Sequence, residues 1–253
     1  ALFNSFGFGG NNATILLGKY QPVRDGHSVH AKRVVISGIG ALAAGANSIE
    51  AIFERLRSGQ SALDTIVEFD TTAYACKQAG MIRDASYPRW INPHLIRKMD
   101  TLSKQAVAAA KFAIEDSGLK INATNCEQIG MIFATGTGPV ETVEAFNRVV
   151  IEQGAKRANP RLFPNTVMNA AAGHVCLQFK IKGPTSTIAV GGVSTLSALY
   201  YAYCLIRRGV VDTVLVASSD ECNEPLLAGH TRIPHFLSGE TLRPFDRKRS
   251  GTI

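Results

Sequence analysis

The stretch TSTIAVGGVSTLSALYYAYCLIRR (residues 185–208) decides the fold class of this chain. Its first part, residues 185–190, alternates weakly between polar and apolar side chains and predicts a β-strand. Gly191 and Gly192 form a tight corner, and residues 194–208 then predict a helix. Because that helix is apolar nearly all round, we expect it to be buried between layers. A strand, a glycine corner and a buried helix together favour an α/β protein.

The rest of the chain repeats this alternation from Lys32 onward. Short β-branched runs between amphipathic stretches indicate a parallel sheet with crossover helices, and so a layered α/β/α architecture. We predict the remaining strands at residues 33–37, 129–134 and 211–217. We predict helices at residues 49–57 (ended by Gly59), 101–117 (capped by Asp100 and ended by Gly118) and from Pro139 to Gly154.

Composition limits the possible classes of protein. The 253 residues, 45% of them hydrophobic and 19% charged, suffice for one large or two small domains. Apolar runs stay well short of the roughly 18 residues that cross a membrane, so we expect a cytoplasmic protein with no membrane span. The net charge of +7 permits an acidic partner. The short basic triplet at 247–249 has no interleaved aromatics, which argues against nucleic acid.

The cysteines and histidines do not form a metal-binding pattern. The five cysteines are an odd number and are widely scattered, so we expect them to be reduced and structural. His174 has no second histidine or carboxylate at metal-ligand spacing and is predicted to be a packing residue. We therefore expect neither a metal nor a cofactor.

Two short motifs suggest other activities. Residues 38–43 form G-x-G-x-x-A after a predicted strand, which could bind a dinucleotide in a nicotinamide-dependent oxidoreductase. The required acidic residue is missing, however, since Glu54 lies within a helix and Asp64 follows no strand, so a structural turn is favoured. Ser194 follows Gly192, but a hydrolase motif would need glycine where Leu196 stands. Ser194 is predicted to be an N-cap or first-turn residue.

Six ordered motifs make the sequence similar to the β-ketoacyl synthase family of the thiolase superfamily. They cover essentially all of residues 32–253. The motifs are the opening segment 33–62, the Arg-Lys-Met-Asp stretch 97–100 before its Ala-rich helix, the strand and T-G-T-G turn 129–138, the N-A-A-A-G-H segment 169–174, the K-G-P segment 182–184 and the R-P-F-D loop 243–246.

The resemblance implies a thiolase-like fold, of which residues 32–253 would be the truncated N-terminal domain. In the family, a catalytic cysteine lies eight positions after the proline of K-G-P, and here that position is Gly192. Glycine cannot form a thioester. Neither Cys176 nor Cys204 can substitute, since one precedes the strand and the other lies three turns into the helix. The resemblance therefore implies a non-nucleophilic, chain-length-factor-like subunit without an intact catalytic residue.

The opening residues carry a second resemblance. Residues 4–14 are similar to the closing strand and loop of a β-ketoacyl synthase, in which Phe6, Phe8 and Gly9 would supply a gate and an oxyanion-type loop. We expect residues 1–19 to be such a C-terminal tail and residues 20–31 to be a linker. A tandem of two synthases explains this order, and a circular permutation remains the alternative.

The resemblance also implies partners. These are a catalytic ketosynthase subunit, as a heterodimer or tandem fusion, and an acyl carrier protein. Arg97 and Lys98 are candidates for carrier docking, and Thr185, Thr187 and Ala189 for a strand that pairs across the dimer. The open alternatives are an active synthase whose cysteine was engineered away and an NAD(P)-dependent oxidoreductase.

Overall fold

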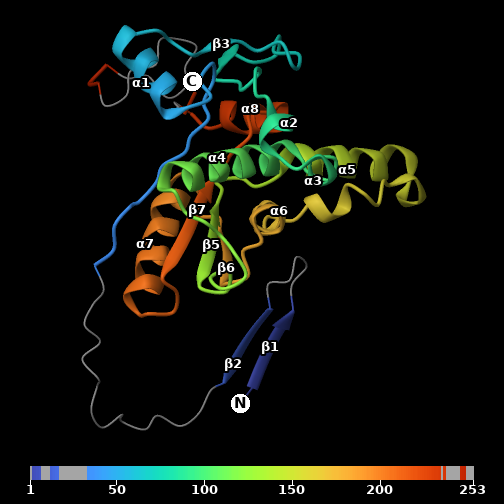
Figure 1. Ribbon diagram of the computed structural model, residues 1–253. Helices are drawn as coiled ribbons and strands as arrows, with labels where there is room; N and C mark the ends of the chain where they lie inside the picture. The colour runs from blue at the N-terminus through green and yellow to red at the C-terminus, as the bar shows by residue number, and fades with distance from the viewer. Residues whose placement is uncertain (1, 7–11, 17–32, 235, 238–245, 249–253) are drawn as a thin grey trace.

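The computed structural model describes residues 2–6, 12–16, 33–234, 236–237 and 246–248. Its core is a parallel three-stranded sheet in the order β6-β5-β7, layered between helices (Figure 1). The predicted α/β class is confirmed. The elements are β1 (Leu2–Phe6), β2 (Asn12–Leu16), α1 (Ile49–Ser58), β3 (Asp64–Thr65), β4 (Gln78–Ala79), α2 (Tyr87–Trp90), α3 (Pro93–Ile96), α4 (Thr101–Ser117), β5 (Ile129–Ala134), α5 (Val140–Gln153), the 3-10 turns η1 (Ala155–Arg157) and η2 (Phe163–Asn165), α6 (Ala170–Phe179), β6 (Thr185–Ile188), η3 (Gly191–Val193), α7 (Ser194–Arg207), β7 (Thr213–Ser218) and α8 (Glu224–Thr231).

The central strand β5 is buried along its whole length. Alternate side chains of a strand point to opposite faces of the sheet. Met131 and Phe133 therefore join one hydrophobic cluster, while Ile132 and Ala134 join another. A strand buried on both faces is typical of a parallel sheet that is covered by helices on both sides.

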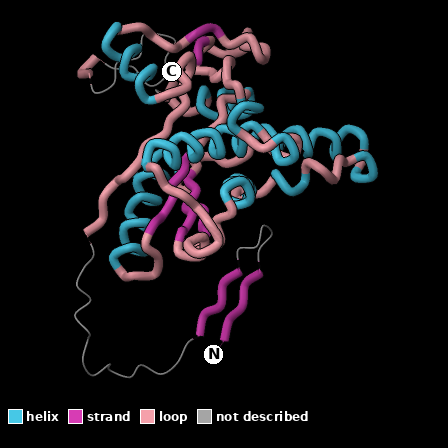
Figure 2. The backbone as a smooth tube through the Cα atoms, viewed as in Figure 1, coloured by secondary structure: helices cyan, strands magenta, loops and turns pink. Residues whose placement is uncertain are grey.

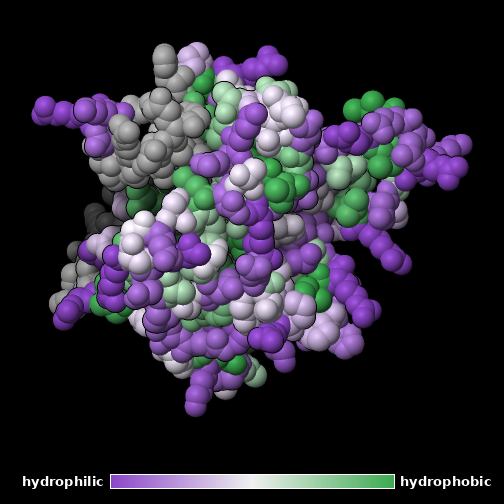
Figure 3. Space-filling view, turned by 90° about the horizontal axis from the view of Figure 1, so that it is seen from above, coloured by the Kyte–Doolittle hydropathy of each residue, from purple (hydrophilic) through white to green (hydrophobic). Residues whose placement is uncertain are grey.

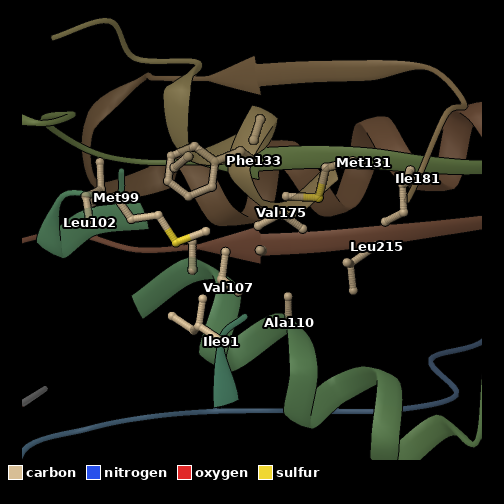
Figure 4. Close-up of a cluster of buried hydrophobic side chains, with 14 of the residues drawn as sticks. Ile91, Met99, Leu102, Val107, Ala110, Met131, Phe133, Val175, Ile181 and Leu215 are labelled. Atoms are coloured by element: carbon tan, nitrogen blue, oxygen red, sulfur yellow. The ribbon is translucent and has the colours of Figure 1, made fainter. Parts of the chain in front are cut away.

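Helices α4 and α6 cover one face of the sheet, and α7 covers the other. Figure 4 shows the first of these cores, where Phe133 and Met131 meet Val107 of α4 and Val175 of α6. On the second face, the small side chains of α7 allow close approach to β5. The predicted helices at 49–57, 101–117 and 140–153 are confirmed, and the Asp100 side chain caps α4 by accepting from Ser103 N at 2.8 Å.

The predicted first strand, residues 33–37, is wrong for this structure. Figure 2 shows the segment as loop, and no described strand pairs with it. Val35 and Ile36 are each 73% exposed. A β-branched run becomes a strand only where a neighbour takes up its backbone groups, and the described sheet places no strand beside this one.

The glycines of the G-x-G motif pack instead against helix α4. A Cβ on Gly38 would lie 2.4 Å from the Ala113 carbonyl oxygen, and one on Gly40 would lie 2.3 Å from that of Ala109. Backbone contacts this short leave no room for a side chain. A structural role for residues 38–43 is therefore supported, although the turn itself lies at residues 43–46.

Helix α7 is not buried between layers within the described part of the chain, so that prediction is wrong here. Ala198 and Ala202 are buried against the sheet, but Leu196 and Tyr200 on the outer face are 69% and 70% exposed. All-round apolarity predicts cover on both sides, whereas the described residues supply cover on one. The outer face of α7 is therefore an exposed hydrophobic surface.

Two further parts flank this core. The C-terminal half of α5 and the turns after it form an arm, which Figure 3 shows projecting from the body with hydrophobic and hydrophilic residues side by side. Ile151 on this arm is 82% exposed. At the N-terminus, β1 and β2 form an antiparallel pair. No helix in the described ranges has the length and apolarity needed to cross a bilayer.

Substituting Gly40 should test the glycine contact with α4. We expect Gly40→Ala to lower the free energy of unfolding by about 1–3 kcal/mol, because the new methyl group must displace helix backbone. Gly173→Ala is the matched control, since a Cβ there meets no described atom within 4 Å and alanine has a higher helix propensity than glycine within α6. Urea unfolding measures both. A Gly40→Ala variant as stable as the parent would contradict this account.

Candidate functional site

The candidate site lies where the three parallel strands end. Parallel strands bring their carboxyl ends to the same edge of a sheet, which is the usual place for function in open α/β folds. The segments that follow β5, β6 and β7 are residues 135–138, 189–194 and 219–221. Hydrogen bonds between these three segments join them into one site.

Ser194 closes the glycine corner. Its buried hydroxyl accepts a hydrogen bond from Val190 N at 2.9 Å, and its oxygen lies 2.6 Å from the Gly191 carbonyl and 2.8 Å from the Thr135 carbonyl. The single hydroxyl hydrogen is shared between these two acceptors. Ser194 is the first residue of α7 but caps nothing, since the N-cap is Val193 without a side-chain bond. Of the two predicted roles, the first-turn position is therefore confirmed and the N-cap is wrong. The hydroxyl joins the segment after β6 to the segment after β5.

Gly191 and Gly192 play different parts in this corner. Gly191 has φ of +68°, in the left-handed region that favours glycine. Gly192 has no such constraint, and among the described residues a Cβ added there meets no atom within 4 Å. A larger side chain at position 192 would therefore fit. The neighbouring cysteines lie elsewhere. Cys176 is on α6, where its thiol is hydrogen-bonded to the Thr185 hydroxyl, and Cys204 is on α7.

Asp220 anchors the turn that follows β5. Its Oδ1 accepts hydrogen bonds from the Thr135 hydroxyl at 2.7 Å, from Gly136 N at 2.7 Å and from Thr137 N at 3.3 Å. Thr135 Oγ1 in turn accepts from Gly138 N at 2.9 Å. One carboxylate oxygen thus orders the whole 135–138 turn beside the glycine corner.

Glu221 joins the N-termini of two helices. Its Oε1 accepts from Leu102 N of α4 at 3.0 Å, and its Oε2 accepts from Glu141 N of α5 at 3.3 Å. Burial raises the pKa of Glu221 to about 7, with the nearby carboxylates of Asp100 and Glu141 adding to the rise and the two backbone bonds opposing it. Glu221 is therefore a buried carboxyl that can change charge near neutral pH.

His174 belongs to a packing network rather than to the corner. Its Nε2 lies 2.9 Å from Asn165 Oδ1, and Asn165 Nδ2 donates to the Lys98 carbonyl at 2.7 Å. Burial lowers the pKa of His174, which favours the neutral ring. These contacts support the prediction of a packing histidine.

The structure places the other predicted residues apart from the corner. Arg97 and Lys98 are exposed between α3 and α4. Thr185 and Thr187 lie on β6, and Ala189 follows it. Of the proposed gating loop, Phe6 ends β1, while Phe8 and Gly9 lie outside the described residues, as does most of the R-P-F-D motif. Sequence reasoning missed Asp220 and Glu221, although an acidic pair directly after a predicted strand is a signal for this edge.

Comparison with known proteins gives the family to which the chain belongs. The family described as "Beta-ketoacyl synthase, N-terminal domain" matches residues 31–253. The chain therefore belongs to the β-ketoacyl synthase family. It is 28% identical over 228 residues to a 3-oxoacyl-[acyl-carrier-protein] synthase 2 of Vibrio cholerae, covering 88% of this chain and 55% of that protein. The corresponding Synechocystis enzyme is 27% identical over 232 residues, covering 89% and 56%.

Solved structures show the same fold. The ishigamide ketosynthase/chain length factor matches with a TM-score of 0.75 at 24% identity, covering 86% of this chain and 54% of that chain. A β-ketoacyl synthase from Burkholderia phymatum matches with a TM-score of 0.78 at 24% identity, covering 87% and 56%. The predicted thiolase-like fold is thus confirmed. The chain spans about half the length of the curated relatives it matches.

The pKa of Glu221 predicts a pH-dependent stability. The folded pKa of about 7 exceeds the ordinary 4.5, so the stabilising contribution is complete below about pH 4.5 and is lost as the pH rises through about 7. We expect the unfolding free energy of the parent, relative to Glu221→Gln, to fall by about 3 kcal/mol across that window. Denaturant titrations at several pH values measure it, with the exposed Glu152→Gln as a control. A pH-independent difference would refute the assignment.

Proposed function

We propose that this chain is a non-nucleophilic, chain-length-factor-like subunit of a condensing pair that acts on acyl groups carried by acyl carrier protein. The observation that carries the proposal is Gly192, which takes the family's nucleophile position in an otherwise ordered corner. Condensation holds the acyl group covalently while the extender attacks, and glycine offers no nucleophile for that bond. A catalytic ketosynthase partner would supply the thiolate.

The free edge of β6 supports pairing with such a partner. The Pro184 carbonyl accepts a hydrogen bond from Met131 N of β5, and the Ile188 carbonyl accepts one from Thr135 N directly after β5. Since backbone groups alternate sides along a parallel strand, those of Thr185 and Thr187 point away from β5. No described strand takes them up. A short edge strand of this kind suits pairing across a dimer, and Ala189 would extend it.

The exposed outer face of α7 supports a larger assembly. It carries Leu196, Leu199 and Tyr200, which are 69%, 41% and 70% exposed. On this proposal, a second α/β half of the thiolase-like fold covers that face, so residues 32–253 form the N-terminal domain. Residues 1–19 would then be the tail of a preceding or permuted synthase, and residues 20–31 its linker. The fold shared with a ketosynthase/chain length factor is compatible with this arrangement.

Arg97 and Lys98 are the proposed contacts for the acidic carrier protein. Both are exposed, and neither forms an ion pair within the described residues. The Lys98 backbone is fixed by its carbonyl bond to Asn165 and its N–H bond to the Leu95 carbonyl. Two unpaired cations on a well-held segment offer an electrostatic docking point.

A reconstituted condensation assay tests the function as a whole. The chain is mixed with a 3-oxoacyl-acyl-carrier-protein synthase that keeps its cysteine, and product lengths are compared with and without it. A longer or narrower product distribution supports a chain-length role. No binding and no change in products would refute it. If Gly192→Cys alone conferred full condensing activity, the disabled-synthase alternative would be favoured.

The β6 edge yields the first specific prediction. Thr187→Pro should remove an outward-facing N–H, and should weaken pairing at least tenfold while leaving the β5–β6 pairing intact. Thr187→Val keeps the N–H and is the matched control. Analytical ultracentrifugation with the partner measures association, and circular dichroism reports folding. A folded Thr187→Pro variant that still pairs fully would show that β6 is not the contact.

The docking segment, residues 97 and 98, yields the second specific prediction. Arg97→Glu and Lys98→Glu, made singly, should each weaken acyl carrier protein binding by about 3- to 10-fold at low salt, with a smaller effect at high salt. Lys120→Glu is the control, because it makes the same charge change at the other end of α4. Fluorescence anisotropy with labelled carrier protein gives the affinities. Equal losses for all three variants would indicate a general charge effect and no local dock.

A further inference from the structure

Asp220 is held at the sheet edge through only one of its two carboxylate oxygens. Oδ1 takes all three hydrogen bonds from residues 135–137. Within the described residues, Oδ2 has no hydrogen-bonded partner. A neutral side chain with one acceptor oxygen, such as asparagine, could therefore order the same turn. The turn requires an acceptor at position 220 but does not require a charge.

The carboxylate and the peptide bond that leads into Gly192 both lie near Gly136. A Cβ on Gly136 would lie 3.3 Å from Asp220 Oδ2 and 3.6 Å from the Gly191 carbonyl oxygen. Both oxygens therefore border the space that is left open because Gly136 has no side chain. The Gly191 carbonyl is half of the peptide bond joining it to Gly192.

A side chain at position 192 would fit at this corner. In the part of the chain that the structure describes, no atom lies within 4 Å of the Cβ that would be added there. The thiolate is the reactive form of cysteine, and a helix N-terminus normally promotes it. A carboxylate at the same corner opposes that effect, because two like charges repel.

We propose that Asp220 makes position 192 electrostatically unsuited to a thiolate, so that two residues, Gly192 and Asp220, together separate this corner from a nucleophilic one. Asp220 is thus a positioning residue for the turn that also sets the charge environment of the corner. The inference rests on the proposed function in taking position 192 as the nucleophile position. It predicts that a cysteine restored there is poorly activated unless the carboxylate is neutralised.

The test measures the pKa of a thiol introduced at position 192 in two variants of the full chain. Iodoacetamide alkylation rates are followed against pH, and fragmentation of the peptide from 183 to 207 separates the introduced thiol from Cys204. In Gly192→Cys we expect a pKa at or above the ordinary value of about 8.5. In Gly192→Cys/Asp220→Asn we expect it about one unit lower, and alkylation about tenfold faster below that pKa.

A charge-matched control isolates the position. Gly192→Cys/Asp212→Asn removes one carboxylate at the other end of β7, about 20 Å away along the strand, and should leave the pKa of the introduced thiol unchanged. An unchanged pKa with Asp220→Asn, or equal shifts with both changes, would overturn the inference. Should the Asp220→Asn variant not fold, the single Gly192→Cys variant still decides. Its thiol pKa should decrease when NaCl is raised from 0.1 to 1 M, because the Debye length shortens from about 10 to about 3 Å. An increase in the pKa would contradict the proposal.

The outcome is separable from that of the proposed function. A pKa shift specific to Asp220, together with no binding to a ketosynthase or carrier protein, would keep this inference and remove the function. Partner binding with no pKa shift would keep the proposed function and remove this inference.

Discussion

The burial of β5 on both faces is the constraint on which the rest of the structure depends. A strand with no solvent-facing side needs apolar cover above and below, and α4 with α6 supplies one cover while α7 supplies the other. That requirement fixes where β6 and β7 pair. It also brings the ends of all three strands to one edge, so the corner, the turn and the acidic pair meet there because of how the core is packed.

Much of the fold could be predicted because local signals and tertiary packing agree. Asp100 and Gly118 bound α4 as a capping residue and a left-handed glycine should. The signals failed where the outcome depends on a neighbour. Residues 33–37 have strand composition without a described strand beside them, and α7 has the composition of a helix covered on two sides. Composition reports what a segment can bury, and the described part of the chain does not supply every surface against which to bury it.

The site was predictable in outline but not in its charges. The glycine corner and position 192 follow from motif order, whereas the positions of Asp220 and Glu221 depend on which turns the sheet brings beside them. The two carboxyls differ in what surrounds them. Glu221 is buried between two helix N-termini, where desolvation favours its neutral form, while Asp220 is exposed and uses one oxygen to order a turn. Adjacent acidic residues thus serve one edge in different ways.

The division of roles between Ser194 and Gly192 has a consequence for how such subunits arise. The hydroxyl of Ser194 holds the corner together, and no described atom packs near a side chain at position 192. On the proposed function, chemistry and stability belong to different residues only two positions apart. An ancestor with a nucleophile at position 192 could then lose it in a single step without weakening the scaffold.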